Sequence, residues 1–153
     1  MEPRIDTAGE LLVAGLTGKA NETGNLWERF SRLNRKAPLK NRENEDGYEI
    51  RFYSGTVEPH VHVGACVKNT GVPNDYETRV LPASAYAVFD IYPVKGYTSQ
   101  NDVMNKWMLE NGKYRQVGLG DRLFAVLIYG ARFKGERDPA SVVECWVPVK
   151  PVD

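Results

Sequence analysis

A carboxylate inside an apolar stretch is the first feature of this sequence that could do chemistry. Residues 141–149 read Ser-Val-Val-Glu-Cys-Trp-Val-Pro-Val, with Glu144 in the middle and Trp146 two positions later. In an extended strand Glu144 and Trp146 point to one face, while Val143 and Cys145 point to the other. Because both faces are apolar, the strand is predicted to be central and covered on both sides. A carboxylate without a partner is costly in such a place.

Three arrangements would satisfy Glu144. It could face water at a strand end, form an ion pair with an internal arginine such as Arg51, or line a cavity that receives a cation. In the third arrangement, aromatic side chains around the cavity would add cation–π attraction of about 2 kcal/mol per desolvated contact. The residues by themselves leave all three arrangements open.

Other groups suggest rival chemistries. His60, His62 and Cys66 share one face of a predicted strand and could bind zinc or copper. The chain has no further histidine, and the spacing matches no standard zinc motif, so an exposed strand face without a metal or cofactor is expected. A glutamate beside tyrosines could also act as a general acid and base, which would make the protein a hydrolase. Asp90 is expected to face solvent.

The composition narrows the possible functions. The chain has 153 residues, with 20 basic and 20 acidic side chains and a formal net charge of zero. No overall field attracts nucleic acid or an anionic membrane. Two cysteines, the lack of a signal-peptide core and the lack of a membrane-length apolar run favour a cytoplasmic protein. A single domain over residues 1–153 is expected from this length.

The predicted elements occur in the same order twice. In the first half they are a strand at 11–17, an amphipathic helix capped by Asn25 with Glu28, a polar loop at 40–47, a strand at 48–53, a Ser54-Gly55 turn and a strand at 60–67. In the second half they are a strand at 85–92, a helix capped within 99–102 and stopped by Gly112, and strands at 123–129 and 142–149. The helix faces comprise Leu26, Trp27, Phe30 and Leu33, and then Val103, Met104, Trp107 and Met108.

This order predicts an α+β fold. Two strand–helix–strand–strand repeats, at about residues 9–68 and 78–150, would form an antiparallel sheet with both helices on one face. A ligand cleft is expected where the two halves meet, because pockets tend to form at such junctions.

The order of these motifs resembles a known family. The sequence is similar to the gyrase-inhibitor-like effector-binding domains, the ligand-sensing parts of AraC-type and MerR-type multidrug-responsive regulators. The closest likeness is to the stand-alone integron-cassette group of drug-binding modules. The residues that carry the resemblance are Leu26-Trp27 with Phe30, Tyr48, Leu81-Pro82-Ala83, Tyr86-Ala-Val-Phe89, Trp107 and Glu144-Cys-Trp-Val-Pro-Val149.

The resemblance implies a cleft with aromatic walls and an acidic floor. Carried over by position, Glu144 is the acid, and the wall consists of Trp27, Phe30, Tyr48, Tyr86, Trp107 and Trp146. Many family members carry a second glutamate in a Phe-Glu-x-Tyr motif on the strand before the last. Neither comparable stretch here, 126–129 or 121–124, retains it.

The implied function is binding of small, cationic, aromatic, amphipathic molecules by a sensor or sequestering module without catalytic activity. The implied setting is transcription regulation, with a possible protein partner and no direct contact with nucleic acid or membrane. Two alternatives remain. One is a hydrolase that uses a Glu/Tyr pair on a reactive small molecule, and the other is an inhibitor that binds a topoisomerase.

Overall fold

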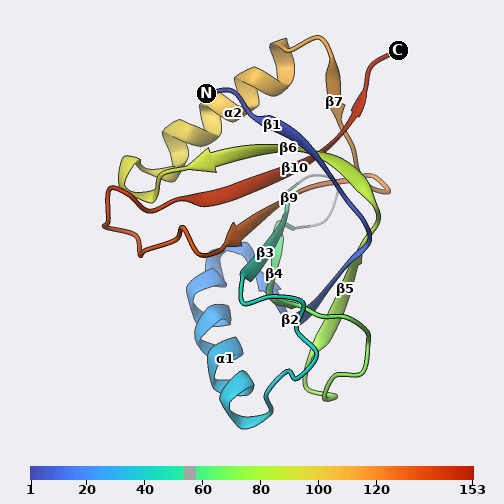
Figure 1. Ribbon diagram of the computed structural model, residues 1–153, viewed down its shortest axis with the longest axis vertical. Helices are drawn as coiled ribbons and strands as arrows, with labels where there is room; N and C mark the ends of the chain where they lie inside the picture. The colour runs from blue at the N-terminus through green and yellow to red at the C-terminus, as the bar shows by residue number, and fades with distance from the viewer. Residues whose placement is uncertain (54–57) are drawn as a thin grey trace.

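The computed structural model describes residues 1–53 and 58–153, which form two long helices and one antiparallel sheet (Figure 1). The helices are α1 (Thr23–Lys36) and α2 (Tyr97–Glu110), and each follows a short 3-10 turn, at Ala20–Glu22 and Pro93–Lys95. The strands are β1 (Arg4–Ala8), β2 (Leu11–Lys19), β3 (Gly47–Phe52), β4 (His60–Cys66), β5 (Glu77–Leu81), β6 (Ser84–Ile91), β7 (Tyr114–Gln116), β8 (Gly118–Leu119), β9 (Arg122–Tyr129) and β10 (Val143–Pro151). The predicted Ser54-Gly55 turn lies outside the described residues.

The strand order is symmetric about the centre of the sheet. The order is β1-β6-β10-β9-β3-β4-β2-β5, with β7 paired to β10 and β8 to β9. Outward from the centre of the sheet, the strands of the first unit, β2-α1-β3-β4, lie in the order β3, β4, β2. The strands of the second unit, β6-α2-β9-β10, lie in the corresponding order β9, β10, β6. The two units meet where β3 pairs with β9. This confirms the predicted fold class. The sequence did not predict the edge strands β1 and β5, which carry charged and exposed side chains, or the short strands β7 and β8.

Both helices cover the same face of the sheet. The strand register aligns five side chains in one row across β6, β10, β9, β3 and β4, namely Phe89, Cys145, Leu127, Glu49 and Val63. Phe89 and Cys145 belong to the core under α2, and Val63 belongs to the core under α1. Glu49 lies between these two cores, on the helix-covered face.

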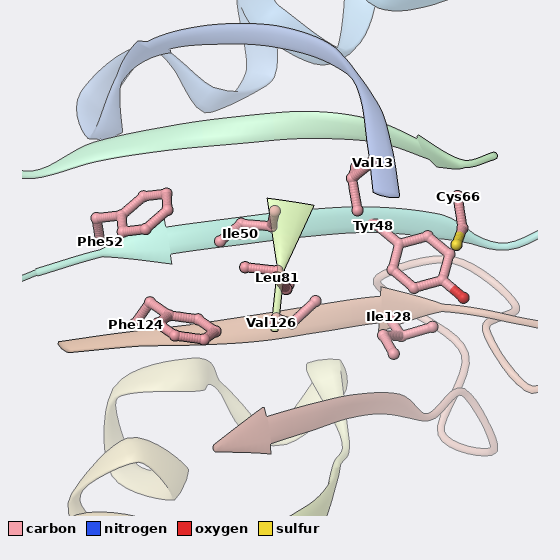
Figure 2. Packing of buried hydrophobic residues seen from close by; sticks show 9 residues of the cluster. All are labelled: Val13, Tyr48, Ile50, Phe52, Cys66, Leu81, Phe124, Val126 and Ile128. Carbon is pink, nitrogen blue, oxygen red and sulfur yellow. The ribbon is translucent and has the colours of Figure 1, made fainter. Parts of the chain in front are cut away.

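The opposite face of the sheet encloses a separate core because the sheet curls. Edge strand β5 ends at Leu81, and β6 near the other edge begins at Ser84, so a two-residue link joins the two sides of the sheet. Figure 2 shows Leu81 directed between Ile50 of β3 and Val126 of β9, within the cluster that fills this space.

A pair of glycines permits the close approach of β2 and β4. Gly15 and Gly64 are paired in the register. A Cβ on Gly64 would lie 2.0 Å from the carbonyl oxygen of Ala14, and one on Gly15 would lie 1.7 Å from that of Val63. Only residues without a Cβ fit at these two positions.

Both predicted helix caps are wrong. Helix α1 begins at Thr23, directly after the 3-10 turn, and the Thr23 hydroxyl donates to the carbonyl of Ala20 at 2.7 Å. Helix α2 begins at Tyr97, and the amide of Gln100 bonds the backbone of Tyr92 and Gly96 to fix its first turn. Gly112 follows the end of α2 with a positive φ of 71°, as expected for a helix stop.

Candidate functional site

A cavity of about 530 Å³ lies on the helix-covered face, between the start of α1 and the inner side of α2. Strands β3, β9 and β10 supply its floor, and α2 supplies one wall. Its lining consists of Thr23, Glu49, Arg51, Tyr53, Ile91, Tyr97, Asn101, Met104, Asn105, Met108, Gln116, Ala125, Leu127, Tyr129, Glu136, Cys145 and Val147. The cleft is therefore at the junction of the two units, where the sequence predicted it.

Glu49 is the buried acid of this cavity, with only 3% of its surface exposed. The indole N–H of Trp27 donates to its Oε1 at 2.9 Å, and the hydroxyl of Tyr129 donates to the same oxygen at 3.3 Å. Arg51 donates from Nη1 to Oε2 at 3.1 Å. The carboxylate is thus held by two neutral donors and one guanidinium, which offset the cost of its burial.

Alternation along β3 explains how Glu49 reaches this position. Tyr48, Ile50 and Phe52 point into the core inside the curled sheet. Glu49 and Arg51 consequently point to the helix-covered face. Since β3 is central in the sheet, that face is covered by protein, and Glu49 becomes buried.

Aromatic side chains surround Glu49. Trp27 packs edge-to-face on Tyr129 with ring centroids 5.8 Å apart, and Tyr129 packs in the same way on Phe133 at 5.0 Å. Burial, followed by the charge of Glu49, raises the pKa of Tyr129 above its ordinary value. Tyr129 therefore stays a neutral phenol that donates a hydrogen bond near neutral pH.

A second carboxylate lies at the mouth of the cavity. Glu136, an exposed residue between β9 and β10, accepts a hydrogen bond from the hydroxyl of Tyr97 at 2.9 Å. Burial, followed by the hydrogen bond to Glu136, raises the pKa of Tyr97. The lining thus holds two carboxylates and one guanidinium, a formal charge of −1.

Cys145 also lines the cavity, and its thiol is buried. Burial raises the pKa of Cys145 to about 12, so the thiolate needed for nucleophilic attack is scarce. Together with Leu127 and Val147 it forms an apolar part of the floor.

The structure corrects the expected position of Glu144. Alternation along β10 directs Cys145 and Val147 to the cavity, and Glu144 to the opposite face. There Arg4 and Arg132 each donate to Oε2 at 2.9 Å, and the indole N–H of Trp146 donates to Oε1 at 2.9 Å. This is the ion-pair arrangement, although its partners are Arg4 and Arg132 instead of Arg51. The aspartate expected to face solvent, Asp90, joins the same network through Arg132 at 2.7 Å.

The six predicted wall residues do not line the cavity either. Trp27 reaches it only through its hydrogen bond to Glu49, and Phe30 packs edge-to-face on Trp27 in the core under α1. Trp107 packs on Phe89 at 5.7 Å under α2. The other three lie on the far face of the sheet, where Tyr48 joins the core inside the curl and Tyr86 and Trp146 pack on each other at 5.2 Å.

The face of His60, His62 and Cys66, which was predicted to be exposed, is largely covered: His62 and Cys66 are buried, and His60 is half-buried. Nε2 of His62 hydrogen-bonds the carbonyl of Val13 at 2.8 Å, and burial lowers the pKa of His62 to about 4. His60 stacks on Phe52, with ring centroids 4.6 Å apart. Over residues 1–53 and 58–153, no group of three or more His, Cys, Asp or Glu side chains could hold a metal ion.

Sequence reasoning missed Glu49, Arg51, Tyr97, Tyr129 and Glu136. A local signal for the first two was present: Glu49 and Arg51 alternate with Tyr48, Ile50 and Phe52 on the strand predicted at 48–53. Glu49 bonds Trp27 and Tyr129, which lie 22 and 80 positions away, and the packing of α1 on the sheet and the pairing of β3 with β9 bring these residues together.

Comparison with known proteins gives structural matches alone: no family model matches the chain, and no curated protein matches its sequence. The structure of SAV2435 bound to tetraphenylphosphonium matches with a TM-score of 0.69 and 17% identity, over 98% of this chain and 94% of that one. The C-terminal domain of EcmrR matches with a TM-score of 0.69 and 12% identity, over 99% and 98% of the chains. EcmrR in its complex with DNA matches with a TM-score of 0.73 and 12% identity, over 99% of this chain and 58% of that one.

The protein has the fold of the effector-binding domains. An integron cassette protein from Vibrio cholerae shares this fold, with a TM-score of 0.53 and 16% identity over 97% and 96% of the chains. The resemblance inferred from the sequence is therefore confirmed at the level of the fold. A hydrolase from Listeria innocua also matches, with a TM-score of 0.53 and 10% identity over 97% and 92% of the chains. No helix in the described parts of the chain is long and apolar enough to cross a membrane.

Proposed function

We propose that this effector-binding domain binds small amphipathic molecules that carry aromatic rings and a positive charge, in the cavity between α1 and α2. The observation that carries the proposal is Glu49, an almost fully buried carboxylate at the floor of that cavity. The protein acts as a sensor or a sequestering module and does no chemistry on its ligand.

Three properties of the cavity support a cationic ligand. Its lining has a formal charge of −1, which favours a positive guest when water is excluded. Its lining includes three tyrosines, Tyr53, Tyr97 and Tyr129, whose rings attract a cation stacked on them. Met104 and Met108 are flexible apolar side chains that adapt to ligands of different shapes. The ligand of the structural neighbour SAV2435, tetraphenylphosphonium, has this chemistry.

The setting we propose is cytoplasmic and linked to transcription regulation through a protein partner. EcmrR, which shares the fold, is a protein solved with DNA. The formal charge of zero on the present chain gives no electrostatic reason for its own contact with nucleic acid. A DNA-binding partner would supply that contact.

Titration with tetraphenylphosphonium tests the binding function. Glu49→Gln is expected to weaken binding by about tenfold or more, since a neutral amide cannot offset the ligand's charge in a buried site. Binding of a neutral analogue of similar size, triphenylphosphine oxide, is expected to change little. Isothermal calorimetry measures both affinities.

The matched control is Glu144→Gln, which removes a carboxylate outside the cavity and is expected to leave the affinity unchanged. If Glu144→Gln weakened binding while Glu49→Gln did not, the ligand would occupy the other face of the sheet and this proposal would be wrong.

A hydrolase is the second candidate, because the cavity holds a glutamate and a tyrosine in contact, Glu49 and Tyr129. The fold match to a hydrolase points the same way. Against it, Oε1 of Glu49 already accepts two hydrogen bonds, from Trp27 and Tyr129, which leaves that oxygen poorly placed to take a proton from water. Turnover of a strained electrophile that is lost in Glu49→Gln would favour the hydrolase.

A further inference from the structure

The floor carboxylate of the cavity already has a cationic partner. Arg51, two residues along β3, donates from Nη1 to Oε2 of Glu49 at 3.1 Å and to Oγ1 of Thr23 at 3.3 Å. All three residues line the cavity. A ligand cation that approaches Glu49 therefore meets a resident positive charge first.

The two members of this ion pair differ in their contact with water. The side chain of Arg51 is 38% exposed, whereas that of Glu49 is 3% exposed. The guanidinium can turn outward and regain its hydration without moving the backbone, while the carboxylate cannot leave the cavity floor. The pair is consequently asymmetric: one charge is fixed and the other is held at the end of a flexible side chain.

Resting on the proposed function, we propose that Arg51 is a tethered counter-ion that occupies Glu49 in the empty protein and is displaced by the ligand. The exchange makes the cavity selective for cations carried on a large apolar body. Such a ligand offsets the loss of the Arg51–Glu49 pair by burying apolar area against Met104, Leu127 and Val147. A small hydrated cation buries almost no apolar area and cannot displace the arginine.

The exposed carboxylate at the cavity mouth is consistent with this exchange. Glu136 keeps the lining at a net negative charge while Arg51 neutralises Glu49. A cation is therefore attracted to the mouth before the inner pair opens. Tyr97, bonded to Glu136, offers it an aromatic face at the same place.

The test compares two probes on the Arg51→Gln variant. The variant is expected to bind tetraphenylphosphonium about tenfold more tightly than the unmodified protein, because no pair has to be broken. Tetramethylammonium is expected to compete with tetraphenylphosphonium in Arg51→Gln and not in the unmodified protein. Arg29→Gln, which neutralises an exposed arginine on α1 outside the cavity lining, is the matched control and is expected to change neither result. Equal or weaker binding in a folded Arg51→Gln variant, or no gain in competition by tetramethylammonium, overturns the proposal.

A double variant separates exchange at Glu49 from simple repulsion by Arg51. If Arg51 acts by occupying Glu49, most of the gain from Arg51→Gln disappears in a Glu49→Gln background. If the gain is the same in both backgrounds, Arg51 only repels the ligand and the counter-ion role is wrong. Should Arg51→Gln fail to fold, Thr23→Ala removes the other hydrogen bond that holds Nη1 and is expected to tighten tetraphenylphosphonium binding about two- to threefold. Unchanged affinity in Thr23→Ala then counts against the proposal.

These outcomes differ from a failure of the proposed function. If the unmodified protein does not bind tetraphenylphosphonium, or if Glu49→Gln leaves that binding intact, the proposed recognition of a cation by Glu49 in this cavity is wrong. If Glu49→Gln weakens binding and Arg51→Gln does not strengthen it, the function stands and only the counter-ion role fails.

Discussion

The two glutamates that dominate this molecule have different environments and different expected roles. Glu49 is enclosed and has a cavity beside it, while the carboxylate of Glu144 belongs to a surface network with Arg4, Arg132 and Asp90. We expect Glu49 to contribute to ligand binding and Glu144 to contribute to the stability of the folded protein.

The pKa of Glu144 gives this second role a pH dependence. Burial raises the pKa, but hydrogen bonds from Trp146, Arg4 and Arg132 outweigh burial and bring it below the ordinary value of 4.5. A carboxyl whose pKa is lowered by folding stabilises the folded state at higher pH, and the contribution is lost as the pH falls through the folded-state pKa.

Glu144→Gln is therefore expected to reduce the free energy of unfolding by about 1 kcal/mol at pH 7, with little difference left near pH 3. Urea unfolding of both proteins at the two pH values measures this. Glu28→Gln, on the exposed side of α1, is the control. A loss as large at pH 3 as at pH 7 would show that the ion pairs are not the cause.

At the residue scale, the sequence could predict which side chains share a face but not what each face meets. Alternation correctly places Glu144 and Trp146 on one face of their strand. Both faces of β10 are apolar, however, so nothing local identified the cavity side. The family resemblance implies that Glu144 lines the cleft, whereas the structure places Glu144 on the face of the sheet opposite the cavity and Glu49 on the cavity side.

At the scale of elements, apolar periodicity was the reliable signal and helix starts were not. The spacing of apolar residues correctly predicts the central parts of strands β2, β9 and β10 and the apolar faces of both helices. One residue of the predicted α2 face, Val103, is exposed. The first turns of α1 and α2 depend instead on 3-10 turns and on Gln100, which bonds backbone groups before the helix. Such contacts leave no periodic trace in a sequence.

The glycine pair between β2 and β4 provides a test at this scale. Gly64→Ala is expected to lower the free energy of unfolding by about 3 kcal/mol or more, because its Cβ would meet the fixed backbone of Ala14. Gly24→Ala, in α1 with nothing within 4 Å of its added Cβ, is expected to be neutral or to stabilise by up to about 1 kcal/mol. Denaturant unfolding compares the two. If Gly64→Ala changed the free energy of unfolding as little as Gly24→Ala does, the close approach of β2 and β4 would be contradicted.

At the scale of the whole molecule, two units meet edge to edge at β3 and β9, and the cavity forms over their junction. The sequence allowed the repeated order and the cleft to be predicted, because each unit contains one amphipathic helix between strands. It did not reveal the curl of the sheet, which depends on the link between Leu81 and Ser84 and on the edge strands β1 and β5. That curl encloses the second core, and the cavity lies on the opposite, helix-covered face.

The most direct measurement is a crystal structure of the protein with tetraphenylphosphonium. We predict that the phosphonium lies between α1 and α2, with its phenyl rings against Tyr97 and Tyr129, its charge nearest to Glu49, and Arg51 turned toward solvent. A ligand bound beside Glu144 on the other face of the sheet, or a complex in which the cavity stays empty, would contradict it.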